Sequence, residues 1–212
     1  MNIHPFVFNP LQENTYLIWD ENSLKAAVID PGMNDRMEEQ LFSRFLEDNG
    51  LRLELCLQTH CHFDHILGVE YIYNKYGIQP RFTESENGVY MSMPSWTKMM
   101  GIYLTENLPP RGELLHVHEP LLLGEIEIQV LPTPGHTPGG VSFYVPDQKV
   151  LFTGDTLFKG SRGRTDLGGN EMDLQRSIRQ QLLTLPADVR VYPGHGPMTS
   201  IADERILWGV GD

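Results

Sequence analysis

The stretch THCHFDHILG, residues 59–68, restricts what this chain can fold into more than any other. It places three histidines and one aspartate within six positions, at His60, His62, Asp64 and His65. Such side chains, held on one turn of the chain, would repel or desolvate one another at a large cost unless a cation lay between them. The stretch therefore predicts a metal site.

Three later stretches each place one metal-ligating residue in a loop rich in glycine and proline, directly after a predicted strand. They are LPTPGHTPGG with His136, LFTGDTLF with Asp155 and VYPGHGP with His195. Loops at strand ends often carry functional residues because the strands fix their position. With the first four, these residues give seven nitrogen and oxygen ligands. That number exceeds one tetrahedral site but suits two metal ions that share a carboxylate.

Hydrophobic periodicity divides the chain into strands and helices, which predict mixed sheets covered by helices. No internal repeat or linker is visible, so a single domain, residues 1–212, is expected. Helices are expected at residues 34–49, at 66–76 with Gly77 as C-cap, from Asn170 and at 200–208. Strands are expected at residues 6–8, 15–19, 26–30, 53–59, 126–131, 140–145 and 149–155, and a last strand with its following loop at 189–196.

A possible capping box and the packing of segment 84–111 each allow more than one interpretation. Asn170 and Asp173 have the spacing of an imperfect capping box. The apolar residues of segment 84–111 either pack in the core or form a cover over the site, and core packing is favoured because apolar side chains usually pack. These residues are Met91, Met93, Trp96, Met99, Met100 and Tyr103.

The net charge indicates which class of partner to expect, and the cysteines indicate the compartment. The formal net charge of −12 repels polyanions, so a small-molecule substrate is expected and nucleic acid is not. No apolar run reaches the roughly 20 residues of a membrane span. Cys56 and Cys61 are not placed to form a structural disulfide, which is typical of a reducing compartment, and we expect the cytoplasm.

The motifs together resemble the ligand pattern of the metallo-β-lactamase superfamily. THCHFDH, TPGHTPGG, GDTLF and YPGHGP resemble the glyoxalase II (hydroxyacylglutathione hydrolase) branch in particular, and the likeness extends from NTYLI and IDPG to the final helix. The resemblance implies an αββα sandwich of two mixed sheets with two divalent metal ions at one edge. We expect zinc, with iron or manganese as alternatives, because sites of histidine and aspartate accept all three.

The same resemblance assigns a role to each ligand. It implies that His60, His62 and His136 hold the first metal, that Asp64, His65 and His195 hold the second, and that Asp155 bridges them. A hydroxide shared by two dications is available near neutral pH and would attack the carbonyl carbon of a small thioester. Asp64 and Asp155 are the expected catalytic carboxylates, since Asp64 would also steer the nucleophile.

The substrate end of the pattern departs from the glyoxalase II branch. In KGSRGRTDLGG, Arg164 stands where the family has a lysine, and Asp166 replaces a tyrosine. The chain resembles the short forms without a C-terminal helical domain, which puts glutathione recognition in doubt. Arg164 and Arg162 are nevertheless the expected substrate-binding residues, because a guanidinium can hold a carboxylate with two hydrogen bonds.

Other interpretations remain open at this point. GRTD also resembles persulfide dioxygenases, which keep these ligands but use one iron, and a lactonase or another hydrolase of the fold is a further alternative. His116 and His118 form an HxH pair for which we expect a surface or strand role. Cys61 lies between two ligands, and we expect its side chain to point away from them.

Overall fold

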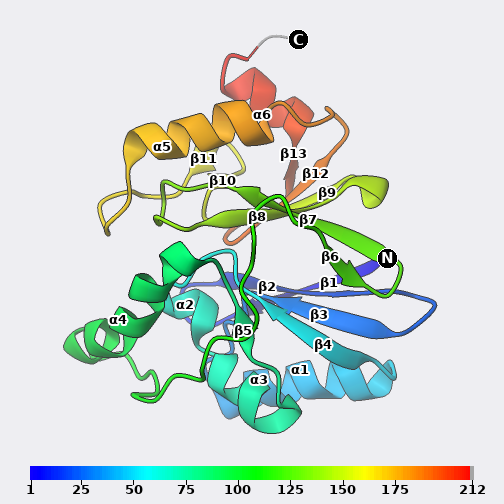
Figure 1. The fold of residues 1–212 in the computed structure, drawn as a ribbon, viewed down its shortest axis with the longest axis vertical. Coiled ribbons are helices and arrows are strands. Elements are labelled where there is room, and N and C mark those ends of the chain that lie inside the picture. The colour runs from blue at the N-terminus through cyan, green and yellow to red at the C-terminus, as the bar shows by residue number, and fades with distance from the viewer. Residues whose placement is uncertain (211–212) are drawn as a thin grey trace.

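Two β-sheets lie face to face in the computed structural model, which describes residues 1–210 (Figure 1). Within these residues the first sheet has the order β1-β2-β3-β4-β5, with bounds Asn2–Phe8, Glu13–Trp19, Lys25–Ile29, Arg52–Leu57 and Pro80–Arg81. The second has the order β13-β12-β9-β8-β7-β6, with bounds Thr199–Ser200, Arg190–Pro193, Val150–Gly154, Val141–Val145, Ile126–Pro132 and Leu121–Leu123. Both sheets mix parallel and antiparallel pairs, as predicted.

The alternation of side chains along each strand builds the layers. In β2, Tyr16 and Ile18 point into the core between the sheets, whereas Leu17 points to the opposite face and packs under helices. Facing residues of the second sheet, such as Phe143 and Phe152, complete the inter-sheet core. The residues between the sheets are thus apolar on every second position, which fixes the strand register.

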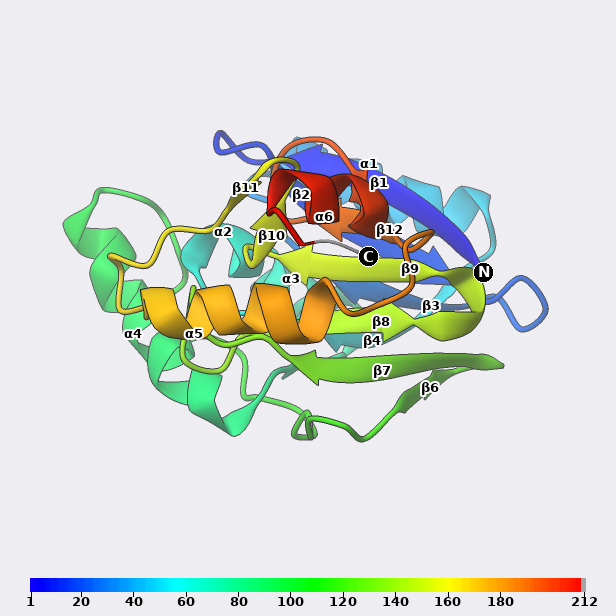
Figure 2. The same ribbon diagram turned by 90° about the horizontal axis from the view of Figure 1, so that it is seen from above.

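Helices cover both outer faces and complete the predicted four-layer αββα sandwich (Figures 1 and 2). The first sheet is covered by α1 (Arg36–Asp48) and α3 (Val69–Tyr76). Over the second lie α5 (Glu171–Arg176), its π-helical continuation η3 (Ser177–Leu182) and α6 (Ile201–Leu207). The short elements are α2 (Phe63–Ile66), the turns η1 (Glu84–Glu86) and η2 (Pro146–Gln148), and the hairpin of β10 (Leu157–Phe158) with β11 (Ser161–Arg162).

Two details of the predicted helices are wrong. The expected helix over 66–76 begins only at Val69, as α3, because the chain turns after α2 and the N–H of Gly68 bonds to the carbonyl of Pro31; Gly77 does end α3 in a left-handed conformation. Asn170 caps α5, but its own N–H donates to the carbonyl of Gly135 and not to Asp173. The capping box is therefore half-formed, because the loop that carries His136 supplies the second bond.

Segment 84–111 contains α4 (Asn87–Met99), which projects from one end of the sandwich (Figures 1 and 2). Its inner face packs Tyr90 and Met93 into an apolar cluster with α2 and α3. Four of the residues expected in the core are instead exposed, namely Met91, Met99, Met100 and Tyr103. Core packing was thus correct only for the inner stripe of the helix. Within residues 1–210, no helix has the length and apolar character needed to cross a membrane.

Strand direction explains why distant motifs meet. β7 and β9 each run antiparallel to β8, and β12 runs parallel to β9, so all three end at the same edge of the second sheet. The parallel strands β3 and β4 end together in the first sheet. Backbone hydrogen bonds from Asn14 to Gly194 and from Val141 to Thr59 join the sheets at this edge. Five strands therefore deliver their following loops to one place.

Candidate metal centre

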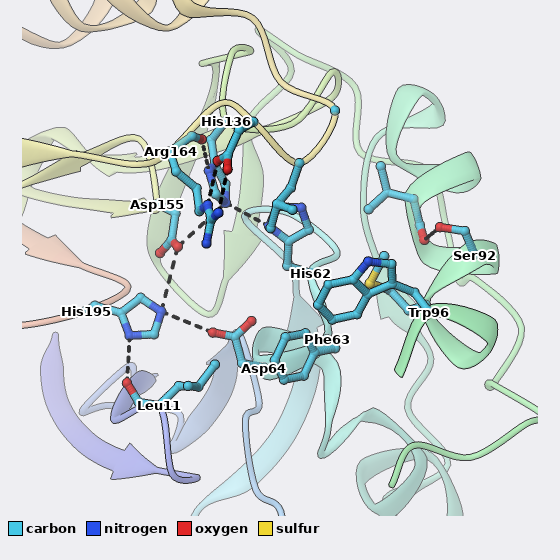
Figure 3. Close-up of a pocket in the computed structure, with 15 residues that line it drawn as sticks. Leu11, His62, Phe63, Asp64, Ser92, Trp96, His136, Asp155, Arg164 and His195 are labelled. Carbon is cyan, nitrogen blue, oxygen red and sulfur yellow. Dashed lines mark hydrogen bonds and ion pairs between the residues drawn. The ribbon is translucent and has the colours of Figure 1, made fainter. Parts of the chain in front are cut away.

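A pocket of about 570 Å³ opens where these loops meet (Figure 3). Five of the seven predicted ligands line it, and the other two, His60 and His65, are buried and in ring contact with each other and with the lining histidines. The structure thus brings together every residue that the sequence predicted as a ligand.

The local backbone of residues 60–65 explains their inward direction. His62 has extended backbone angles and precedes α2, so alternate residues His60 and His62 face the same side. Cys61 points the other way, into the apolar cluster beneath α4, as expected. Burial raises the pKa of its thiol well above the usual value, which favours the protonated form. The turn of α2 then directs Asp64 and His65 inward.

Three imidazoles form the first group of candidate ligands. Atoms of His60, His62 and His136 that can bind a metal lie within 4.8 Å of one another. Nδ1 of His62 is 2.8 Å from Nε2 of His136 (Figure 3). Burial lowers the pKa of His62 to about 4 and also lowers the pKa values of His60 and His136. All three rings are therefore neutral near pH 7, which is the form that binds a metal.

One aspartate and two imidazoles form the second group. Ligand atoms of Asp64, His65 and His195 also lie within 4.8 Å of one another, and Oδ2 of Asp64 is 3.2 Å from Nε2 of His195. Burial alone would lower the pKa of His65, but the carboxylates of Asp64 and Asp155 raise it well above the usual value. The pKa of His195 is raised in the same way.

Asp155 lies between the two groups. Its Oδ2 is 3.6 Å from Nε2 of His136 in the first group and 3.7 Å from Nε2 of His195 in the second. Its Oδ1 is 3.4 Å from Nε2 of His65. These histidines hold the pKa of Asp155 well below its usual range against the opposing effect of burial. A carboxylate in this place can be shared by two cations.

Unpartnered buried atoms test whether metal ions fit the site. In the described part of the chain, Nε2 of His60, Nε2 of His65 and Oδ1 of Asp155 are shielded from solvent and make no hydrogen bond, although the last two atoms lie 3.4 Å apart. A buried polar atom without a partner is costly, and all three atoms are of ligand type. Divalent cations would satisfy them, so the donor set fits the metals implied by the superfamily.

A second ring of residues orients the imidazoles from outside. Each partner engages the Nδ1 atom and so leaves Nε2 to face the centre. The pairs are Thr59 Oγ1 with His60 at 3.1 Å, Asp30 Oδ2 with His65 at 3.1 Å, the Arg164 carbonyl with His136 at 2.7 Å, and the Leu11 carbonyl with His195 at 3.2 Å. Asp30 also accepts the N–H and hydroxyl of Thr59, so it acts as an orienting residue although it lies near His60 and His65.

Sequence reasoning missed these orienting residues. Asp30 was visible as a carboxylate directly after an apolar strand, the same pattern that marked Asp155. Glu86 gave no signal, yet it is buried and accepts backbone N–H groups from Cys61 and Gly139. The sequence also did not show how closely the backbone at Gly194 approaches His65. A Cβ atom at position 194 would lie 2.8 Å from Cε1 of His65.

The expected substrate-binding arginines are both ion-paired. Arg164 lines the pocket but donates two hydrogen bonds to Asp166, and Arg162 donates to Glu171 at 2.6 Å. His116 and His118 follow η1 and α4 in sequence, belong to none of the candidate ligand groups found in residues 1–210 and do not line the pocket. Both side chains are exposed.

Comparisons with known proteins identify relatives of this chain. The family profile described as the metallo-beta-lactamase superfamily matches residues 8–195. The probable metallo-hydrolase YqgX of Bacillus subtilis is 36% identical over 92% of this chain and 90% of its own length. The hydroxyacylglutathione hydrolase GloC of Haemophilus influenzae is 35% identical over 97% of this chain and 95% of its own.

Two solved structures share the fold along almost the full chain. The B3 metallo-beta-lactamase BLEG-1 is 32% identical, with a TM-score of 0.85 and 97% coverage of both chains. TTHA1623, solved in a di-iron-bound form, is 35% identical, with a TM-score of 0.83 and coverage of 95% of this chain and 96% of its own. The predicted fold class is thereby confirmed. The chain belongs to the metallo-beta-lactamase superfamily.

Proposed function

We propose that this protein is a metal-dependent hydrolase that binds two divalent ions and cleaves small thioesters. The observation that carries the proposal is the place of Asp155 between two groups of three ligands, with shielded ligand atoms of His60, His65 and Asp155 left without partners. Similarity to GloC, a hydroxyacylglutathione hydrolase, supports the thioester class. Zinc is the proposed metal, and the di-iron form of TTHA1623 keeps iron as the alternative.

The side chains have separate tasks in this reaction. When bound, the two cations would polarise the substrate carbonyl and lower the pKa of a water nucleophile. His60, His62 and His136 would hold one cation, Asp64, His65 and His195 the other, and Asp155 both. Asp64 also lines the pocket, where its carboxylate can orient the attacking water and take up its proton. Phe63 and Trp96 line the side of the pocket that faces Asp155 and His195 (Figure 3).

The compartment and partners follow from the same proposal. A small thioester is the expected partner, since the acidic chain has no charge match with nucleic acid. Cys56 and Cys61 are both free, which supports the reducing cytoplasm as the compartment.

Metal content and thiol release test the proposal together. We expect elemental analysis of zinc-loaded protein to give two ions per chain and a thioester panel to release free thiol. A single firmly bound iron, with sulfite produced from a persulfide, would assign the chain to the dioxygenases. Hydrolysis of lactones in place of thioesters would keep the metal centre and change the substrate.

A further inference from the structure

The pocket beside the ligands has two unlike walls. On one side lie apolar side chains from α2 and α4, namely Phe63, Val89, Met93 and Trp96. The rings of Phe63 and Trp96 are stacked, with centroids 5.3 Å apart and planes at 30° (Figure 3). This apolar wall can take an aromatic or branched aliphatic group, because burial of such a group against it removes apolar surface from water.

The opposite wall carries an ion pair between two of its own residues, Arg164 and Asp166. Nε of Arg164 donates to Oδ1 of Asp166 at 2.6 Å, and Nη2 donates to Oδ2 at 2.5 Å. Both residues line the pocket, and Arg164 is the one lysine or arginine among its lining residues within 1–210. The guanidinium edge formed by Nε and Nη2 is therefore occupied, and the carboxylate of Asp166 offsets the positive charge that Arg164 brings to the pocket.

We propose that the pocket selects thioesters with an uncharged apolar acyl group and a neutral thiol portion, and that Asp166 withholds Arg164 from anionic substrates. The inference rests on the proposed thioester hydrolysis and specifies its substrate class. It replaces the expectation that Arg164 holds a substrate carboxylate.

Tethering explains why an exposed pair can have this effect. A single exposed ion pair is weak, but Asp166 stands two residues from Arg164 and competes at the high effective concentration of an intramolecular group. A substrate carboxylate has to displace it from millimolar or lower concentration in solution. The apolar wall meets no such competitor.

Binding of thioethers that cannot be hydrolysed tests the selectivity apart from catalysis. Calorimetry on zinc-loaded protein would compare S-benzyl-N-acetylcysteamine, which is neutral, with S-benzylglutathione, which is anionic. We expect the neutral compound to bind more tightly, and Asp166→Asn to tighten binding of S-benzylglutathione alone by about five- to tenfold. Combining Arg164→Gln with Asp166→Asn should remove that gain.

A matched control separates local release of Arg164 from the change in net charge. Asp188 pairs with Lys149 on the surface, and neither residue lines the pocket. Asp188→Asn therefore frees a cation and removes one negative charge, as Asp166→Asn does, and should leave both affinities unchanged. An equal gain in the two variants would show a long-range charge effect and overturn the role of Asp166.

The apolar wall has its own test. Trp96→Ala should lower the ratio of S-benzyl to S-methyl N-acetylcysteamine affinity by about tenfold, because the aromatic contact is lost. Trp96→Leu keeps apolar volume and should give a smaller loss, and thermal unfolding checks that both variants fold. Wild-type protein that binds S-benzylglutathione at least as tightly as the neutral compound would overturn the proposal. The expected affinities without any thiol release from thioesters would instead leave the pocket assignment intact and refute the proposed reaction.

Discussion

Glu86 accepts the backbone N–H of Gly139 at 2.8 Å through Oε1, while its Oε2 accepts the N–H of Cys61 at 2.9 Å. Cys61 lies between two candidate ligands, and Gly139 lies three residues after His136. One buried carboxyl group therefore joins the ligand loop of the first sheet to a ligand loop of the second. Neither loop can move without loss of a hydrogen bond to it.

Replacing this carboxyl group should destabilise the protein. We expect Glu86→Ala to lower the free energy of unfolding by about 2–4 kcal/mol, because two buried N–H groups lose their acceptor. Chemical denaturation of the zinc-loaded protein measures the change. The control is Glu84→Ala, since the side chain of Glu84 is exposed in the same turn and forms an ion pair with the partly buried Arg111. Equal stabilities of the two variants would contradict the linking role of Glu86.

Asp155→Ala should lose most of the bound metal and nearly all hydrolytic activity. Two cations would lose their shared anion, and His65, His136 and His195 would each lose a carboxylate neighbour. Mass spectrometry of metal content and thiol release from a neutral thioester measure the two effects.

A double replacement outside the site is the control for Asp155→Ala. Changing His116 and His118 to alanine should leave metal content and turnover close to those of the parent, because neither lines the pocket. Loss of metal in this variant would show that the ligand set is wrong.

Metal loss on acidification should occur in two steps. Carboxylates raise the pKa values of His65 and His195 despite burial, whereas burial lowers the pKa of His62 to about 4. Protons compete with metal for unprotonated imidazole, so the group with raised pKa values should release its metal at the higher pH. Equilibrium dialysis in buffered zinc from about pH 8 to about pH 4 measures this order.

Ligand variants assign the two steps. His195→Ala should remove the step at higher pH, and His62→Ala should remove the step at lower pH. The reverse assignment would contradict the electrostatic difference between the two groups.

Sequence patterns were sufficient to predict the features that recur as one local pattern. His136, Asp155 and His195 each follow an apolar strand in a loop of glycine and proline, and strand direction then brings the three loops together. The periodicity of residues 34–49 likewise predicted α1, and Asp35 is its N-cap in the structure. These features depend on residues that are close in the chain.

Features that depend on distant partners could not be predicted in this way. Nothing near Glu86 in the sequence indicates that its acceptors serve Cys61 and Gly139, which are 25 and 53 residues away. The pairing of Arg164 with Asp166 was also missed, although the residues are neighbours, because their side chains could equally have faced a substrate. The prediction of core packing for segment 84–111 was wrong for the outer face of α4, because the sequence does not show which face of that helix meets α2 and α3.

Gly194→Ala should weaken metal binding through simple lack of space. A Cβ atom at this position would collide with Oδ1 of Asp155 and lie 2.8 Å from Cε1 of His65. Both are predicted ligands, and the methyl group has to displace at least one of them. We expect zinc affinity to fall by at least about a hundredfold, since displaced ligands no longer meet the short distances that zinc requires. Competition with a chromophoric chelator measures the affinity.

Gly88→Ala is the control, because Gly88 is exposed in α4 with open space around its Cβ position. That substitution should leave zinc binding unchanged and stabilise the helix by about 0.5–1 kcal/mol. Unchanged zinc affinity in Gly194→Ala would mean that Asp155 and His65 do not bind the metal in the conformation described.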